Sequence, residues 1–122
     1  MSFDLKVGVQ VAGLPADKPP LYVCIATPEF DQPTYNLATL FRRCTGWDFV
    51  QGTWYRASEV INLICNGIFE LVYKPDVYKP FLPANGWGTI KSALDSLKSW
   101  RDTIYETAED KEIPLDALWV RW

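Results

Sequence analysis

The sequence predicts an α+β domain in which a small antiparallel sheet is covered on one face by three helices. Three observations support this fold class. The chain has 122 residues, the length of one domain, and 48% of them are hydrophobic, enough to build a core. Stretches with the two-residue period of strands lie at both ends of the chain, and stretches with the period of helices lie between them. This order, two strands, three helices and a strand, favours helices packed on one face of the sheet.

The two N-terminal strands differ in their pattern. Residues 3–11 alternate apolar and polar side chains, which predicts a strand whose core face carries Leu5, Val7, Val9 and Val11. A loop rich in Gly, Pro and Asp follows over residues 12–20. Residues 21–26 are a continuous run of strand-forming residues, which predicts a second strand, buried on both faces or central in the sheet. Antiparallel pairing of the two strands is the simplest arrangement.

The first helix is expected to have a capping residue at each end. Thr34 is the expected N-cap and Gly46 the expected C-cap, with apolar side chains at three- and four-residue spacing between them. Residues 47–56 then show no clear period. They form either a loop or a short hairpin that turns at Gln51 and Gly52.

The second helix is expected to begin at Ser58, an N-cap residue, and to continue to Val72. Asn66 and Gly67 weaken its middle and predict a kink or an early end. Three prolines within residues 75–83 exclude a continuous helix from the connection that follows. Aromatic side chains in this connection predict that it lies on the body of the protein.

The last helix has the clearest start signal. Residues 85–89 read Asn-Gly-Trp-Gly-Thr; the glycines permit a positive φ or a close approach, and Thr89 is the expected N-cap. Residues 90–105 carry an apolar stripe, and residues 108–112 are expected to form an acidic loop. Residues 113–122 end the chain as a strand with aromatic side chains on both faces. This strand is either central in the sheet or an edge that pairs with a partner.

Charge and composition exclude several classes of function. The net charge is −3 and the pI about 4.8, so the chain lacks the basic excess that binding to long nucleic acid or an anionic membrane requires. His, the commonest general base and metal ligand, does not occur in the sequence. We therefore expect no enzymatic activity, no metal site and no cofactor.

The cysteines and the hydropathy pattern predict the cellular compartment of the protein. Cys24, Cys44 and Cys65 are widely spaced in apolar surroundings, so they are expected to be reduced thiols packed as small hydrophobes. No signal peptide is apparent, and no apolar segment is long enough to cross a bilayer. A cytoplasmic location is therefore expected.

Aromatic side chains are the most unusual feature of the composition. Six Trp, six Tyr and six Phe make up 15% of the chain, more rings than a core of this size needs. Some of these rings are therefore expected at the surface, where Trp and Tyr are typical of binding sites.

The candidate binding residues lie near helix ends or outside regular elements, and each contributes an aromatic, amide or guanidinium group. They are Tyr35, Asn36, Arg42, Arg43, Trp47, Trp54, Tyr55, Arg56, Asn85 and Trp87. Rings beside arginine are typical of protein interfaces and of stacking on nucleobases. Free N–H groups at helix starts, and paired arginines, suit a phosphate or a carboxylate. A structural role is the alternative for each group: a cap, a solvated helix end, a tight turn or core packing.

Short motifs in the chain resemble those of one family. Residues 34–36 read Thr-Tyr-Asn at a helix start, and residues 85–88 read Asn-Gly-Trp-Gly before the final helix. In these motifs and in element order, the chain resembles small uncharacterised proteins of bacteriophages, prophages and gut bacteria. It departs from them at residues 83–85, Pro-Ala-Asn, where two prolines are expected. The resemblance implies a viral or mobile-element setting, in the cytoplasm of a host cell, and carries over no catalytic residue.

Together these features predict a non-catalytic binding protein of phage type that acts against host defence. Two forms of this function are open. In one, a pocket sequesters a small anionic, nucleotide-like ligand; in the other, an exposed aromatic patch blocks a host protein. The alternative is a self-associating structural or assembly protein, a homo-oligomer that pairs through its aromatic C-terminal strand. The expected partners include neither long nucleic acid nor a membrane.

Overall fold

The computed structural model describes residues 5–28, 37–48, 50, 52–84, 86 and 88–121. Within these ranges the chain forms a four-stranded antiparallel sheet with helices packed against it, which confirms the α+β class. The strands are β1 (Lys6–Gln10), β2 (Tyr22–Ala26), β3 (Tyr55–Arg56) and β4 (Trp119–Arg121). The helices are α1 (Ala38–Thr45), α2 (Ala57–Tyr73), α3 (Pro75–Tyr78) and α4 (Ile90–Asp110), with 3₁₀ turns at Lys79–Phe81 and Leu115–Ala117. Over the described ranges no helix combines the length and the apolar character needed to cross a bilayer.

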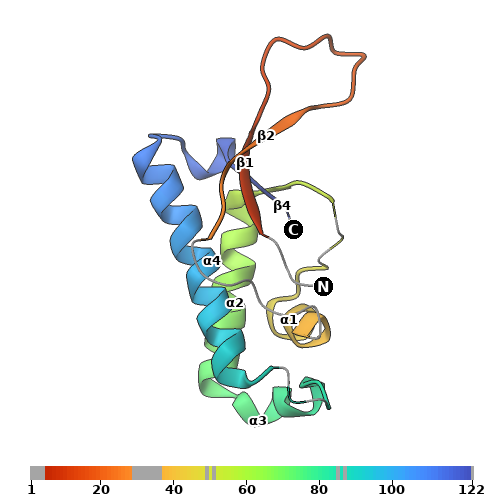
Figure 1. Ribbon diagram of the computed structural model, residues 1–122, viewed down its shortest axis with the longest axis vertical. Helices are drawn as coiled ribbons and strands as arrows, with labels where there is room; N and C mark the ends of the chain where they lie inside the picture. The colour runs from red at the N-terminus through yellow and green to blue at the C-terminus, as the bar shows by residue number, and fades with distance from the viewer. Residues whose placement is uncertain are drawn as a thin grey trace.

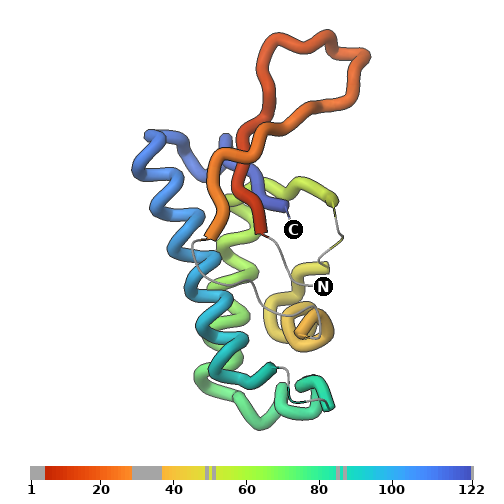
Figure 2. Tube along the Cα trace, viewed as in Figure 1, coloured from red at the N-terminus to blue at the C-terminus, as the bar shows by residue number. Residues whose placement is uncertain are grey.

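β1 and β2 form an antiparallel hairpin whose connection projects beyond the body of the protein (Figures 1 and 2). The sheet order is β2-β1-β4-β3, so β2 lies at an edge. The prediction that this strand is buried on both faces or central is therefore wrong: Leu21 is 56% exposed and Val23 is 51% exposed. An apolar run indicates a strand, but it does not say whether a second neighbour will cover it.

β4 lies between β1 and β3, so the central position predicted as one alternative for the C-terminal strand is correct. Lys6 pairs with Arg121 on one side, and Tyr55 pairs with Val120 on the other. Trp119 and Val120 therefore have a strand neighbour on both sides and offer no free backbone edge to a second copy of the chain. The strand is also shorter than predicted, because a 3₁₀ turn occupies Leu115–Ala117.

α2 and α4 run side by side (Figure 1). α2 is continuous through Gly67, so the early end predicted there as one alternative is wrong. A Cβ at Gly67 would lie 2.6 Å from Cγ2 of Thr45 and 3.1 Å from Cδ1 of Leu97. Glycine is thus required here because α1 and α4 both pack closely against α2, and not because the helix ends.

The predicted start of α4 is confirmed. Gly86 has a φ of 76°, and a Cβ at Gly88 would lie 2.5 Å from Cδ2 of Leu37. Thr89 Oγ1 accepts a hydrogen bond from Ser92 N at 3.0 Å, and Thr89 N donates to Ser92 Oγ at 2.8 Å. This reciprocal capping box fixes the first turn of the helix. The acidic loop is wrong for residues 108–110, which continue α4 to Asp110.

The other caps agree only in part with the sequence. Gly46 is the C-cap of α1 in the left-handed region, as predicted. α2 begins at Ala57 and not after a Ser58 cap; the backbone N–H of Ala57 donates instead to the carbonyl of Leu118 at 2.8 Å. A long-range backbone hydrogen bond therefore replaces the local cap. Thr34 lies outside the described residues.

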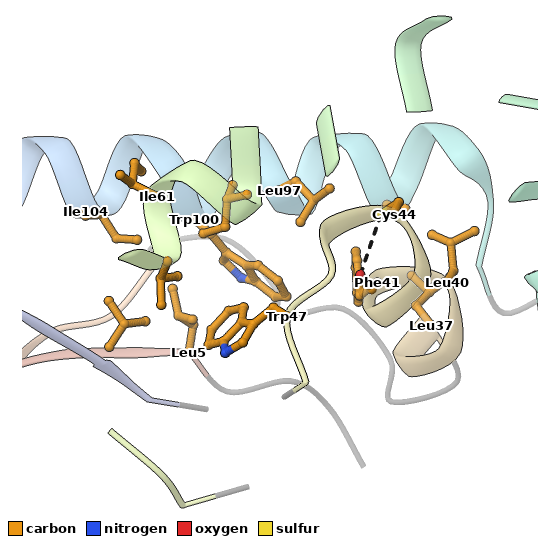
Figure 3. Close-up of a cluster of buried hydrophobic side chains, with 14 of the residues drawn as sticks. Leu5, Leu37, Leu40, Phe41, Cys44, Trp47, Ile61, Leu97, Trp100 and Ile104 are labelled. Carbon is orange, nitrogen blue, oxygen red and sulfur yellow. Dashed lines mark hydrogen bonds between the residues drawn. The ribbon is translucent and has the colours of Figure 1, made fainter. Parts of the chain in front are cut away.

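The core lies between α1, α2, α4 and the inner face of the sheet, and Trp47 and Trp100 are its largest side chains (Figure 3). Trp47 is 2% exposed and Trp100 is 1% exposed. The ring centroids of Phe41 and Trp100 lie 5.1 Å apart. Tyr78 is also buried, which confirms that the connection after α2 lies on the body.

The three thiols do not share one environment, contrary to the prediction that all pack as small hydrophobes. Only Cys44 is buried; Cys24 and Cys65 are exposed. Burial raises the pKa of the Cys44 thiol from 9.0 to about 12. Sequence context did not separate the three because each has apolar neighbours in the chain.

An aromatic disulfide reagent is expected to titrate Cys24 and Cys65 in the native protein and Cys44 only after denaturation. In addition, the unfolded chain ionises Cys44 near pH 9 while the folded chain keeps it neutral, so its contribution to stability is lost as pH rises above 9. Urea unfolding at increasing pH measures this loss. In a Cys44→Ala control the thiol count should be the same before and after denaturation; a third fast-reacting thiol in the native wild type would contradict the prediction.

Candidate functional site

The predicted cluster at residues 54–56 is divided between two sides of the sheet. Successive side chains of an extended strand point to opposite faces. The ring of Tyr55 packs edge-on against Trp47, with centroids 5.4 Å apart at 89°. Trp54 and Arg56 instead contact rings on the outer face of the sheet, the face away from the core.

Four side chains from three parts of the chain form a continuous array on this outer face. Trp54 stacks on Tyr22, with centroids 5.1 Å apart at 19°. Tyr22 also meets Trp119 edge-on, with centroids 5.1 Å apart. The guanidinium of Arg56 lies 4.8 Å from the centroid of Trp119. We call Tyr22, Trp54, Trp119 and Arg56 the ring array; its three rings are half-buried and Arg56 is exposed.

Gly8 allows the ring array to lie directly on the sheet. A Cβ at this position would lie 2.8 Å from two ring carbons of Trp54 and 2.6 Å from the carbonyl oxygen of Val23. Sequence reasoning missed Gly8, Tyr22 and Trp119 as site residues. A glycine inside an alternating strand was the available signal, since it marks a close approach of another group.

The outer face is basic although the chain carries a net charge of −3. Lys6 and Arg121 are direct cross-strand partners, and Arg56 pairs with Trp119, so the three cations share this face. Because side chains alternate between the two faces along each strand, no outward position of the described strands carries a carboxylate. Nε of Arg121 is buried and has no hydrogen-bond partner among the residues described. Arg56 donates from Nη1 to the carbonyl of Asp116 at 2.6 Å.

The two arginines at the end of α1 do not form a fork. Arg42 Nε donates to the carbonyl of Asp48 at 3.0 Å, whereas the Arg43 guanidinium lies 5.3 Å from the ring centroid of Phe81. Trp47 is part of the core, so the structural alternative holds for it. Four of the predicted binding residues lie outside the described part of the chain: Tyr35, Asn36, Asn85 and Trp87.

A cavity of about 260 Å³ lies beside Trp47 and Tyr55. Asp48 and Glu59 also line it, which disfavours an anionic ligand. The Tyr55 hydroxyl donates to Oδ1 of Asp48 at 2.6 Å. Burial and this hydrogen bond raise the pKa of Tyr55. A larger hollow, of about 510 Å³, is lined by residues 10–16 with Lys18 and Pro20 of the hairpin, and this lining has no aromatic ring and no arginine.

Family models, curated proteins and solved structures give no match to this chain. The resemblance to phage proteins, and the setting that it implies, therefore stay predictions. In the ranges that the structure covers, no group of three or more His, Cys, Asp and Glu side chains is placed to hold a metal ion. The geometry of the ring array and its cations is the basis on which a function is proposed.

Proposed function

We propose that the protein binds a small nucleotide-like anion on the outer face of the sheet, without converting it chemically. One observation carries the proposal: the ring array shares its face with Lys6 and Arg121, and no outward strand position on that face holds a carboxylate. The expected role is sequestration of the ligand. The phage setting and the action against host defence rest on the sequence resemblance and stay predictions.

The ring array suits the base of such a ligand. Base stacking on aromatic side chains contributes about 1–3 kcal/mol per base and tolerates any base, because every base has a π-face. Arg56 is exposed on top of Trp119, so its guanidinium plane is a further stacking surface. The base is therefore placed at the Arg56 end of the array.

The cations suit the phosphate. Lys6 lies directly across from Arg121, so two cationic side chains are neighbours on the outer face. Guanidinium groups form paired, charge-assisted hydrogen bonds with phosphate oxygens. Three cations in a chain of net charge −3 match a small ligand and not a long polyanion, whose binding requires an extended basic track.

Calorimetry and thermal unfolding with a nucleoside monophosphate and diphosphate test this proposal. A ligand that binds only the native state should raise the melting temperature, by the equivalent of about 2.7 kcal/mol at one hundred times its Kd. The corresponding nucleoside and inorganic phosphate should each give a smaller shift, because each offers only half of the contacts.

Two variants tie the binding to the outer face. Trp119→Ala is expected to weaken the nucleotide affinity by about 1–3 kcal/mol, roughly 5- to 150-fold. Arg56→Gln, which retains most of the side-chain length, should also weaken it. Arg101→Gln on α4 is the matched control, since Arg101 pairs with Asp102 at 3.0 Å outside the array. The absence of any nucleotide-dependent shift, or equal affinities in Arg56→Gln and Arg101→Gln, would overturn the proposal.

A further inference from the structure

The edge of the sheet at β2 is the feature that the proposed function leaves unused. β2 has one strand neighbour in the described sheet, β1. The hairpin that contains it projects from the body (Figures 1 and 2). Leu21 and Val23 are more than half exposed. Val23 lies across from Val9, on the face of the sheet that packs against the core elsewhere.

The hydrogen-bond pattern identifies which backbone groups point outward from this edge. Val11 N donates to Leu21 O at 2.8 Å, so Leu21 is hydrogen-bonded to β1. In an antiparallel pair hydrogen-bonded residues alternate, which turns the backbone groups of Tyr22 and Cys24 away from β1. Each of these two residues presents one N–H and one C=O at the outer edge. A second extended strand satisfies this pattern, whereas a helix does not.

The charge pattern selects the kind of strand. No charged side chain occurs from Pro19 to Pro28. Sheet edges are commonly protected by a lysine or another charge, and like charges directly opposite each other destabilise a strand pair. The β2 edge carries neither obstacle, so a copy of the same strand meets no repulsion when it pairs antiparallel to it.

We infer that a second copy of this chain pairs with β2 through an antiparallel two-fold contact centred on Val23. In this register Tyr22 lies opposite the partner's Cys24, and all four outward backbone groups of each strand form hydrogen bonds. A shift by two residues toward either end of the strand loses part of this set. It either places Tyr22 opposite the partner's Ala26, a residue that pairs with Val7 of β1, or brings Pro20, which has no N–H, into the pair. Val23 then lies across from the partner's Val23 in a non-hydrogen-bonded pair.

The two-fold pairing also extends the outer face of the sheet. Tyr22 is the member of the ring array that lies on β2, so the arrays of the two subunits become neighbours on one continuous sheet. The contact uses main-chain groups of β2 and the exposed side chains of Leu21 and Val23. It is independent of whether the ring array binds a nucleotide.

A charge-swap experiment tests the interface in the full chain. Sedimentation and native mass spectrometry should give twice the 14.0 kDa chain mass for the wild type. Val23→Lys and Val23→Glu should each be monomeric, because the two-fold axis places like charges against each other. An equimolar mixture of the two variants should restore the dimer. Val23 is 51% exposed, so both variants are expected to fold, which circular dichroism checks.

Cysteine cross-linking tests the register. In a Cys24→Ser, Cys65→Ser background, Val23→Cys should form an intersubunit disulfide, since Cα atoms in a non-hydrogen-bonded pair lie about 4.5 Å apart. Leu21→Cys is the matched control, as exposed as Val23. It should not cross-link, because the two copies of residue 21 are four residues apart along the strands, about 14 Å at a strand rise of about 3.4 Å per residue.

Three results would overturn the inference. One is a monomeric wild type, including a monomer that pairs its β2 edge with a strand of another protein. Another is a dimer that persists in Val23→Lys, which would place the interface elsewhere. The third is equal cross-linking of Leu21→Cys and Val23→Cys.

Discussion

Trp100→Ala is expected to lower the free energy of unfolding by about 3–5 kcal/mol, as for other large aromatic side chains removed from a packed core. Trp100 is 1% exposed and its ring contacts that of Phe41 at the centre of the core (Figure 3). The loss is a large part of the total stability of a small domain, about 5–15 kcal/mol. Urea unfolding followed by far-ultraviolet circular dichroism measures it.

Tyr105→Ala is the matched control for Trp100→Ala. Tyr105 lies on the same helix but is 45% exposed, so its removal is expected to change the stability by no more than about 0.5 kcal/mol. Similar losses in the two variants would mean that the packing of α4 against the core is not as described.

Gly67→Val is expected to destabilise the protein by about 3 kcal/mol or more, because it overpacks the contact of α2 with α1 and α4. A Cβ alone would lie 2.6 Å from Cγ2 of Thr45. Thr45 cannot turn aside without loss, since its hydroxyl donates to the carbonyl of Phe41 at 2.6 Å and accepts from Trp47 N at 3.0 Å. Removing a helical glycine normally stabilises a helix, so the sign of the effect is itself diagnostic.

Thermal and urea unfolding of Gly67→Val should be compared with Cys65→Val on the same helix. Cys65 is exposed, so a valine there is expected to cost only a few tenths of a kcal/mol through helix propensity. Unchanged or increased stability of Gly67→Val would show that α1 does not pack against α2 at Thr45.

Local signals in the sequence predicted most of the elements correctly. Thr89 and Ser92 form the cap of α4, and Gly46 ends α1, because such contacts involve residues only a few positions apart. The alternation of residues 3–11 predicted β1 and its core face in part: Leu5 and Val7 are fully buried, whereas Val9 and Val11 are only half-buried. These features depend on residues that are close together in the chain, and such residues can be read directly from the sequence.

Errors occurred where a residue depends on a distant neighbour. Ala57 begins α2 because its N–H donates to the carbonyl of Leu118. Position 67 requires a glycine because Thr45 and Leu97 approach it closely. β2 is an edge strand because the sheet ends there, which its own apolar run does not indicate. The periodicity of apolar residues indicates which face of a helix or strand is buried. It does not indicate which other element covers that face.

By itself, the sequence determined the α+β class, the close turn before α4 and the surplus of aromatic rings; it did not place β3 between α1 and α2 or α3 before α4. Only the tertiary structure decided where those rings lie. Trp47 is buried, whereas Trp54 meets Tyr22 and Trp119 across a sheet in which β4 lies beside β1. The physical reason is that caps and periods arise from contacts within a few residues, while sheet order is set by the pairing of strands far apart in the chain.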